Sequence, residues 1–286
     1  MSSVPETASG AIVEGESQET ERRYKGEFVD ALARGLDVIC AFSADAPEMT
    51  LTEVAARTGL SPATARRCLL TLKELGYVGL NGRRFLLRSK VLLLGGAFLD
   101  SMHLRDIADP FLQELAEAFH DSASMAVLEK KEIVYVAHAA SKREPRFRVR
   151  IGWRLPANAT SLGHVLLAAL SPNDQASFLK QGPFTRYTAR TTVDAVELQT
   201  ILQSVRRDGY ACVQDQLEYG SIAIAVPVHD AKGEVFAAIN CSSETSRVDA
   251  AELVRSRLPR LREAAREITD SVARYPALVH SINATR

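Results

Sequence analysis

Cysteine, tryptophan and long apolar runs are scarce in this 286-residue sequence. The four cysteines, Cys40, Cys68, Cys212 and Cys241, are far apart and form neither a CxxC pair nor a metal-type cluster with the six histidines. They are typical of reduced thiols in a cytosolic protein. No run of about 18 apolar residues is present, and the polar first 27 residues do not resemble a signal peptide. We expect a cytoplasmic protein with no membrane segment and no metal.

Motifs of the common enzyme classes are also missing. The chain has no G-x-S-x-G elbow, no Walker loop, no H-E-x-x-H motif and no glycine triplet of a dinucleotide-binding fold. His138 and His164 could serve a nucleophile such as Ser161 or Cys241. Both histidines border apolar segments, however, where a packed and hydrogen-bonded histidine is the commoner outcome. We expect no catalytic residue and no cofactor, and an enzyme stays as the weaker alternative.

An excess of one charge is absent overall, because 35 basic and 35 acidic residues cancel. The distribution is uneven, however. Between Arg57 and Lys90, eight basic residues accompany the single acid Glu74, which gives a net charge of +7 over 34 residues. Such an excess suits a polyanion, because each phosphate contact releases condensed counterions. Charge runs are commonly solvated faces, so the local structure has to decide.

Two short helices are predicted here, one that ends at the start of this basic segment and one that lies within it. Thr50-Leu51-Thr52-Glu53 has the form of a capping box, and Gly59 ends the helix that it opens. Ser61-Pro62 starts the next helix, because serine caps helices and proline is favoured at their first position. An earlier helix is expected over residues 28–42. The expected apolar positions are Leu32, Leu36, Ile39 and Cys40 in the earlier helix, and Ala65, Cys68, Leu69, Leu72 and Leu75 in the last.

A basic β-hairpin is predicted directly after these helices. Residues 76–80 and 84–87 read as strands around the turn Asn81-Gly82-Arg83. Two helices followed by such a wing form a winged helix-turn-helix over residues 28–88, which binds double-stranded DNA. We expect Ser61, Thr64 and Arg67 to read bases, and Arg66, Arg83, Arg84 and Arg88 to contact phosphates. The alternatives are a solvated charge for each arginine and a plain helix cap for Ser61.

The remaining segments predict three further parts. Residues 1–27 are expected to be a disordered tail, and the apolar residues 89–104 a helix that links two domains or packs on another chain. Residues 105–286 are expected to form an α+β domain with a mainly antiparallel sheet. Its helices are predicted at 107–119, 162–170, 193–207 and 250–272, and its strands at 124–128, 133–137, 146–151, 222–228 and 235–241.

With these parts in place, the sequence resembles the IclR family of bacterial regulators from about residue 28 to residue 275. The resemblance implies a winged helix-turn-helix, a linker helix, a GAF-like effector domain, and homodimers that often pair into tetramers. In the DNA-binding half it depends on the segments at 51–55, 59–61, 72–78 and 93–95. In the other half it depends on Arg154-Leu155-Pro156-Ala157, Thr160-Ser161-Leu162-Gly163, Leu166-Leu167-Ala168, Tyr187-Thr188, Gly209-Tyr210 and Ala225-Val226-Pro227-Val228.

Within that family, the segment from Arg146 to Gly163 is most similar to regulators of aromatic-acid breakdown. This similarity implies an effector such as 4-hydroxybenzoate or protocatechuate, and an activator more than a repressor. A repressor that responds to a non-aromatic acid, such as β-ketoadipate, is the alternative. A DNA-binding architectural protein without a ligand is a further rival. One departure concerns the pocket, because Ile222 stands where many relatives have arginine.

The effector pocket is expected between the sheet and the loop at 158–163, where an apolar helix begins. The free amides of a helix N-terminus suit a small aromatic carboxylate. The expected contacts are Trp153, Asn158, Thr160, Ser161 and Leu162 from the loop region, and Asn240 and Ser242 from the last strand. Two alternatives stay open: Trp153 belongs to the core or an interface, and Ser161 is an ordinary helix cap with the ligand elsewhere. Arg148 and Arg150 meet either a carboxylate or water.

Overall fold

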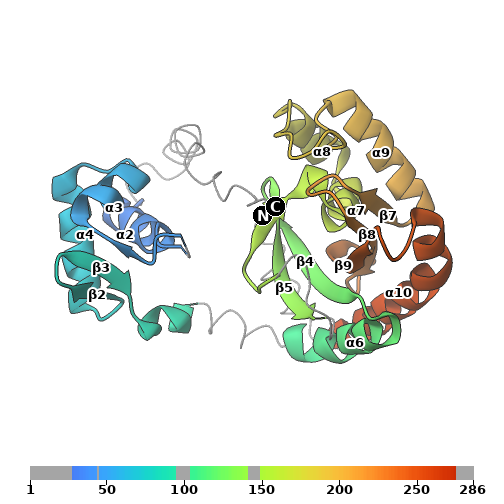
Figure 1. Ribbon diagram of the computed structural model, residues 1–286, viewed down its shortest axis with the longest axis horizontal. Coiled ribbons are helices and arrows are strands. Elements are labelled where there is room, and N and C mark those ends of the chain that lie inside the picture. The colour runs from blue at the N-terminus through green and yellow to red at the C-terminus, as the bar shows by residue number, and fades with distance from the viewer. Residues whose placement is uncertain (1–27, 44, 95–103, 141–148, 275–286) are drawn as a thin grey trace. The chain divides into compact units, whose positions relative to one another are not determined.

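The computed structural model describes residues 28–43, 45–94, 104–140 and 149–274. The chain divides into two compact units, residues 1–98 and 99–286 (Figure 1). Among the described helices, none has the length and hydropathy of a membrane span. The predicted tail (1–27), Arg148 and most of the predicted linker helix (89–104) lie outside the described residues. The described start of that linker is a short 3-10 turn, η1 (Ser89–Val91), followed by three helical residues.

The described part of the first unit, up to the 3-10 turn, contains three α-helices and a small antiparallel sheet. The capping box at Thr50 and Glu53 is present, and Gly59 ends its helix with φ of 67°. Ser61 caps the following helix, as its sequence predicts. The elements are α2 (Asp30–Cys40), β1 (Glu48–Met49), α3 (Leu51–Thr58), α4 (Pro62–Glu74), β2 (Val78–Asn81) and β3 (Arg84–Leu87), with strand order β1-β3-β2. The predicted helix-turn-helix and wing are therefore confirmed.

The predicted apolar face of α2 is only partly correct, because Ile39 packs, partly buried, against the core whereas Leu32, Leu36 and Cys40 are exposed. Val38 is the buried residue of this helix and joins the core with Ala65 and Leu69 of α4. Leu32 and Leu36 are 63% and 46% exposed. The spacing of apolar residues identifies a stripe along a helix but not what covers it. The predicted core position Leu75 is likewise 52% exposed.

The second unit is built on a six-stranded antiparallel sheet in the order β6-β5-β4-β9-β8-β7. The predicted strands at 124–128, 133–137, 222–228 and 235–241 and the predicted final helix are confirmed, and the strands pair as two antiparallel hairpins. The strands are β4 (Ser122–Glu129), β5 (Glu132–Ala139), β6 (Arg154–Pro156), β7 (Ala211–Gln214), β8 (Ser221–His229) and β9 (Val235–Glu244). The helices are α6 (Leu104–Phe119), η2 (Ala157–Ala159), α7 (Ser161–Ala169), α8 (Pro172–Leu179), α9 (Ala195–Asp208) and α10 (Ala250–Val272).

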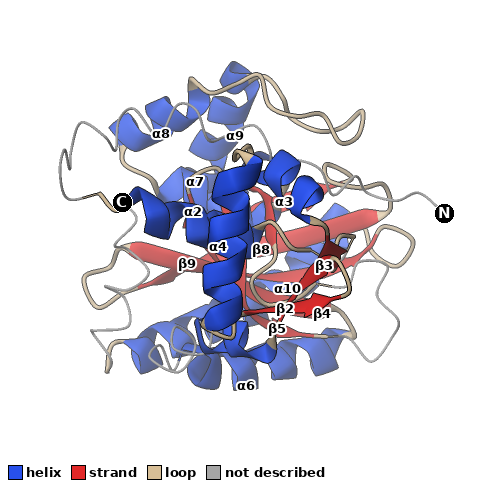
Figure 2. Ribbon diagram, turned by 90° about the vertical axis from the view of Figure 1, so that its left-hand side faces the viewer, coloured by secondary structure: helices blue, strands red, loops and turns tan. Residues whose placement is uncertain are grey.

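Helices cover both faces of this sheet. One face packs on α6 and α10 around Leu112, Phe236 and Leu261, and the other on α7 and α9 around Leu166 and Leu202. In Figure 2 the strands of the sheet, in red, run between α6 and the pair α8 and α9. This three-layer, mainly antiparallel arrangement confirms the predicted α+β class.

One strand prediction is wrong. The described residues of the predicted strand at 146–151 form a turn, in which Trp153 N donates to the Arg150 carbonyl at 3.1 Å and Gly152 has φ of 84°. The edge strand β6 comes after this turn. A glycine with positive φ needs no side-chain clearance and so permits the sharp reversal.

Candidate DNA-binding surface and effector pocket

The N-terminal turn of α4 carries the residues expected to read bases. Ser61 Oγ accepts a hydrogen bond from Thr64 N at 3.3 Å and lies 2.9 Å from Thr64 Oγ1. Ser61 is therefore a helix cap, and its hydroxyl is already engaged with Thr64. Arg66 and Arg67 are exposed and form no ion pair within the described residues. These two guanidiniums are available to a nucleic acid.

The wing presents arginines of two kinds. Arg84 Nη1 donates to the Glu48 carbonyl at 2.9 Å and lies 3.4 Å from Glu53 Oε2, so Arg84 ties the wing to the start of α3. Hydrogen bonds from Thr50, together with the charge of Arg84, hold the pKa of Glu53 below its usual value. Arg83 and Arg88 are exposed, and neither forms an ion pair with a described residue. Of these two candidate phosphate contacts, Arg83 is the freer one within the described residues, and Arg84 also has a structural role.

A cavity of about 270 Å³ opens in the second unit where α7 begins. Its floor is the polar end of β4, β8 and β9, and the segment 215–220 closes one side. This cavity is the candidate for the expected effector site, and we call it the effector pocket. It is lined by His120, Ser122, Ser124, Tyr135, Val149, Leu155, Ala159, Thr160, Ser161, Leu162, Val213, Asp215, Gln216, Leu217, Glu218, Gly220, Ser221, Ala223, Asn240, Ser242, Ser243, Glu244 and Arg247. Five of the expected contacts are among them, namely Thr160, Ser161, Leu162, Asn240 and Ser242.

The start of α7 is fixed by Thr160 and Gly163. Thr160 is the helix cap, because its Oγ1 accepts from Gly163 N at 3.1 Å. A Cβ on Gly163 would lie 2.1 Å from the Ala157 carbonyl oxygen, so only glycine permits α7 to approach η2 this closely. Ser161 is consequently the first residue of the helix. The alternative in which Ser161 acts as the cap is wrong.

Ser161 and Asn240 bring unpaired polar atoms to this pocket. Ser161 is 2% and Asn240 is 5% exposed, and neither Ser161 Oγ nor Asn240 Oδ1 has a hydrogen-bond partner among the described residues. A buried polar atom without a partner costs about 1–3 kcal/mol. Two such atoms from separate elements at one cavity indicate a site for a polar ligand.

The polar floor of the pocket results from the alternation of side chains along the strands. On the pocket side, β9 runs from Ala238 to Asn240 and Ser242, and β4 runs from Ala126 to Ser124. Small apolar residues thus lie under α7, and hydroxyl and amide groups lie beyond it. Ser124 Oγ also contacts His138 Nδ1 at 2.9 Å, and burial lowers the pKa of His138. The neutral imidazole holds Ser124 in place.

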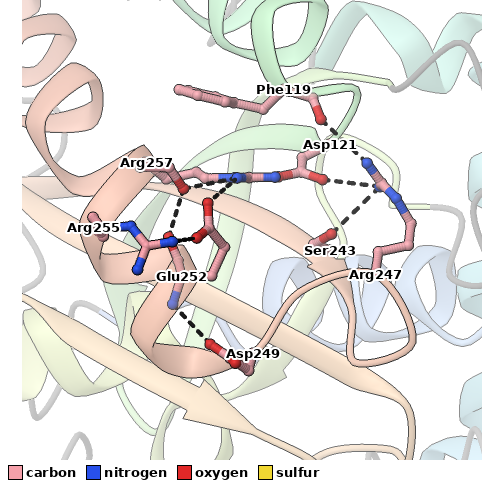
Figure 3. A network of polar contacts seen from close by, with 9 residues as sticks. Phe119, Asp121, Ser243, Arg247, Asp249, Glu252, Arg255 and Arg257 are labelled. Carbon is pink, nitrogen blue, oxygen red and sulfur yellow. Dashed lines mark hydrogen bonds and ion pairs between the residues drawn. The ribbon is translucent and has the colours of Figure 1, made fainter.

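Tyr135 and Arg247 add a phenol and a cation to the lining. Burial raises the pKa of Tyr135, so this phenol stays protonated and can donate a hydrogen bond. Arg247 Nη1 donates to Asp121 Oδ1 and to the His120 carbonyl, each at 3.0 Å, and its Nη2 donates to the Phe119 carbonyl at 3.2 Å. Figure 3 shows the buried Asp121 carboxylate between Arg247 and Arg257. The pocket is therefore connected to the C-terminal end of α6.

Two expected contacts do not line the pocket. Asn158 is buried below the loop, where its Nδ2 donates to the Thr192 carbonyl at 3.2 Å. Trp153 packs, partly buried, against the core between the sheet and α7, which agrees with the core alternative. Arg150 is exposed in the turn before β6. Ile222 is fully buried on the opposite sheet face, among the residues that pack on α6 and α10, so its side chain does not reach the pocket.

His164 and Cys241, which were considered for catalysis, are buried and contribute to the structure. His164 Nε2 donates to the Asn158 carbonyl at 2.7 Å, and burial lowers the pKa of this histidine. Burial raises the pKa of the Cys241 thiol, which lies on the sheet face away from the pocket. A neutral histidine and a protonated thiol on opposite faces do not form a nucleophile and its base.

Several lining residues were missed by sequence reasoning. Ser124 pairs with Asn240 across β4 and β9, so the two side chains lie on the same face of the sheet. The alternation of side chains along β4 could have placed Ser124 on the pocket floor. Asp215 and Glu218 lie in a segment without periodicity, so no pattern points to them. Arg247 follows the last strand and becomes a pocket residue only through its bonds to Asp121 and the end of α6.

Known families account for both units. The profile described as IclR helix-turn-helix domain matches residues 31–81, and the profile described as bacterial transcriptional regulator IclR C-terminal matches residues 96–270. The chain belongs to the IclR family. The family identified from the sequence motifs is confirmed, and its members are DNA-binding transcriptional regulators and not enzymes.

Named relatives cover nearly the whole chain. The Pca regulon regulatory protein of Pseudomonas putida is 40% identical over 85% of this chain and 84% of its own length. The p-hydroxybenzoate hydroxylase transcriptional activator of Acinetobacter baylyi is 38% identical over 86% of this chain and 93% of its own length. An IclR homologue from Microbacterium hydrocarbonoxydans, solved in complex with 4-hydroxybenzoate, is 25% identical with a TM-score of 0.74, over 85% of this chain and 99% of that one.

Proposed function

We propose that this IclR-family regulator is a cytoplasmic activator of genes for aromatic-acid breakdown and that a monocyclic hydroxybenzoate is its effector. The relatives support the chemical class, since their names refer to p-hydroxybenzoate hydroxylase and to the Pca regulon, and one structural neighbour holds 4-hydroxybenzoate. The name of the Acinetobacter relative supports an activator.

The observation that carries this proposal is the pair of unpartnered atoms at Ser161 and Asn240. A hydroxybenzoate has a carboxylate and a hydroxyl on one ring. The Ser161 hydroxyl, the free amides of the first turn of α7 and the Tyr135 phenol are donors suited to the carboxylate. Asn240 Oδ1 is an acceptor suited to the ligand hydroxyl, and Leu155 and Leu162 cover the ring. The carboxylates of Asp215, Glu218 and Glu244 favour placing the ligand carboxylate on the α7 side.

DNA recognition is proposed for α4 and the wing. Arg66 and Arg67 on the first turns of α4 and Arg83 in the wing form no ion pair with any described residue, so all three can contact DNA without breaking such a pair. Thr64 adds a hydroxyl beside Arg67. Ser61 was expected to read bases, and we now propose that it contacts the DNA backbone instead, because its hydroxyl is already hydrogen-bonded to Thr64 at the helix N-terminus.

Dimerisation is proposed from the exposed apolar surface of the first unit. Leu32 and Leu36 form a stripe on α2, and Leu92 and Leu93, which follow η1, are 75% and 64% exposed. An apolar stripe of this kind marks an interaction surface. A second copy packed on this surface would give a homodimer with two DNA-binding units. Two such dimers could then associate into a tetramer.

Calorimetric titration of the full chain tests the effector. We expect 4-hydroxybenzoate or protocatechuate to bind with a micromolar dissociation constant. Saturable binding of β-ketoadipate without either aromatic acid would instead favour the alternative of a regulator for a non-aromatic acid. Absence of binding by all three acids would contradict the proposal.

A further inference from the structure

A second cavity, of about 580 Å³, lies at the edge of the sheet along β8, where α7 and α9 on one face approach α10 on the other. Its floor is apolar and includes Val165 and Ala168 of α7, Val205 of α9 and Ala265 of α10. Arg206, Arg262 and Arg266 stand around it, together with His229. The size lies within the usual range for small-molecule sites, roughly 300–1,000 Å³.

The three arginines are not neutralised. Arg206 donates to the carbonyls of Ala168 and Leu170, each at 2.7 Å, and Arg262 donates to the Asp208 carbonyl at 2.8 Å. Arg266 Nε donates to the Arg262 carbonyl at 3.3 Å. These bonds orient the guanidiniums but leave their charge intact, and no carboxylate pairs with any of the three within the described residues.

Several other arginines of this unit do have carboxylate partners. Arg247 and Arg257 share Asp121, and Arg260 on α10 contacts both Glu114 and Glu263. Three unpaired guanidiniums at one cavity repel one another, and an anion bound among them would remove this repulsion. Guanidiniums also match the planar oxygens of a carboxylate.

The edge of the sheet at this cavity disfavours a protein strand as occupant. β7 pairs with β8 only as far as Ala225, so β8 beyond it has an open edge. The Ser221 carbonyl accepts from Asp215 N on the β7 side, and by alternation Pro227 faces the same side. Proline has no N–H to offer there, which prevents regular strand pairing.

We propose that this second cavity binds a small organic carboxylate with an apolar body. The arginines would hold the carboxylate, and the floor of valine and alanine side chains would cover the body. The site is distinct from the effector pocket. The two cavities are formed on α7, β8 and β9 but have no lining residue in common: Ser161 begins α7 at the effector pocket, whereas Val165 and Ala168 line the second cavity.

Calorimetry on the full chain with octanoate, benzoate and inorganic phosphate tests the proposal. The titration is made in a Ser161→Leu background, in which the effector pocket is filled, so the result does not depend on which acid binds there. We expect octanoate or benzoate to bind at one site per chain. Adding Arg262→Gln and Arg266→Gln should weaken that binding at least tenfold, whereas Arg274→Gln, an exposed arginine at the end of the same helix, should leave it unchanged.

Other results are expected if the three arginines form only a charged surface and the second cavity binds no ligand. Absence of binding by both organic acids, unchanged affinity in the double variant, or phosphate binding as tight as octanoate would each overturn the proposal. A change of oligomeric state in the double variant, with no acid bound by the parent, would assign the cavity to a second copy. If Ser161→Leu does not fold, the double substitution in the wild-type chain must remove one carboxylate site per chain, and retention of that site would contradict the proposal.

Discussion

Arg247 lines the effector pocket and at the same time donates a hydrogen bond to Asp121 Oδ1 over 3.0 Å. Asp121 is fully buried in its side chain, and its other oxygen lies 3.1 Å from Arg257 Nε. Arg247 also holds the carbonyls of Phe119 and His120, so the pocket wall and the end of α6 share one guanidinium (Figure 3). A ligand that moves Arg247 would therefore act directly on α6.

The Asp121 cluster is predicted to be a main source of stability in the second unit. Asp121→Asn would leave Arg257, which is 13% exposed, with only the more distant and more exposed Glu252 carboxylate, at 3.8 Å, as a counter-charge. Breaking a buried pair in this way costs about 3–5 kcal/mol. Urea unfolding should show this loss, whereas Asp270→Asn, at an exposed position of α10, should change the free energy of unfolding by less than about 0.5 kcal/mol. Equal effects of the two substitutions would argue against the cluster.

Arg67 and Arg83 are predicted to contribute to DNA binding in different ways. Arg67→Ala should cost about 1–3 kcal/mol and relax the preference at one base pair, because it removes a contact to a base edge. Arg83→Ala should weaken binding to all sequences alike and reduce the salt slope by about one. Binding measured at several salt concentrations separates the two effects, and wild-type behaviour of both variants would contradict the assignment of the DNA-binding surface.

Arg84 is predicted to contribute both to DNA binding and to the stability of the first unit. Arg84→Ala should weaken DNA binding to all sequences and also lower the unfolding temperature of the first unit, because Arg84 Nη1 holds the Glu48 carbonyl. Arg83→Ala serves as the matched control, since Arg83 has no ion pair with a described residue. An unchanged unfolding temperature for Arg84→Ala would show that the wing does not depend on this bond.

The apolar stripe on α2 is predicted to hold two chains together. Leu36→Glu should convert the dimer to a monomer at micromolar concentration, because a charge would replace an apolar contact. Leu75→Glu is the control, since Leu75 is similarly exposed but lies at the end of α4. Sedimentation analysis decides, and a wild-type chain that is already monomeric would contradict the dimer.

His164 is predicted to make the second unit less stable in acid. Burial lowers its pKa in the folded chain below the unfolded value of about 6.5, so the unfolded state takes up the proton first as the pH falls. The stability due to neutral His164 is thus complete above about pH 6.5 and declines below it. His164→Asn should reduce the difference between urea midpoints measured at pH 8 and pH 5.5. An unchanged difference would mean that His164 is not responsible.

Local signals in the sequence predicted most of the fold. The capping box at Thr50, the Ser61-Pro62 start and the Asn81-Gly82 turn each act over a few residues, and each is present as predicted. Of the predicted face of α2, Ile39 packs on the core but Leu32 and Leu36 do not, because which residues cover a helix face depends on contacts between distant parts of the chain. The strand before Gly152 was also wrong, since a positive φ at one glycine outweighed the alternation of the preceding residues.

Only part of the effector pocket was predicted, because sequence patterns mark local features and not contacts between distant residues. Thr160, Ser161 and Leu162 lie at a helix start that the motif itself marks, and Asn240 and Ser242 share one strand face. Asn158 and Trp153 belong to the same motif region, but their side chains turn into the interior, which spacing does not reveal. Arg247 depends on contacts more than 120 residues apart in the chain and left no local pattern.

The most direct test of the account is the affinity of the Ser161→Leu chain for 4-hydroxybenzoate and protocatechuate, with binding to operator DNA measured on the same preparation. Leucine at this position would fill the pocket beside Asn240, so the account predicts that the effector response is lost while DNA affinity is retained. Ser177→Leu, an exposed serine on α8, should behave as wild type. Unchanged hydroxybenzoate affinity in the Ser161→Leu chain would contradict the assignment of the effector pocket.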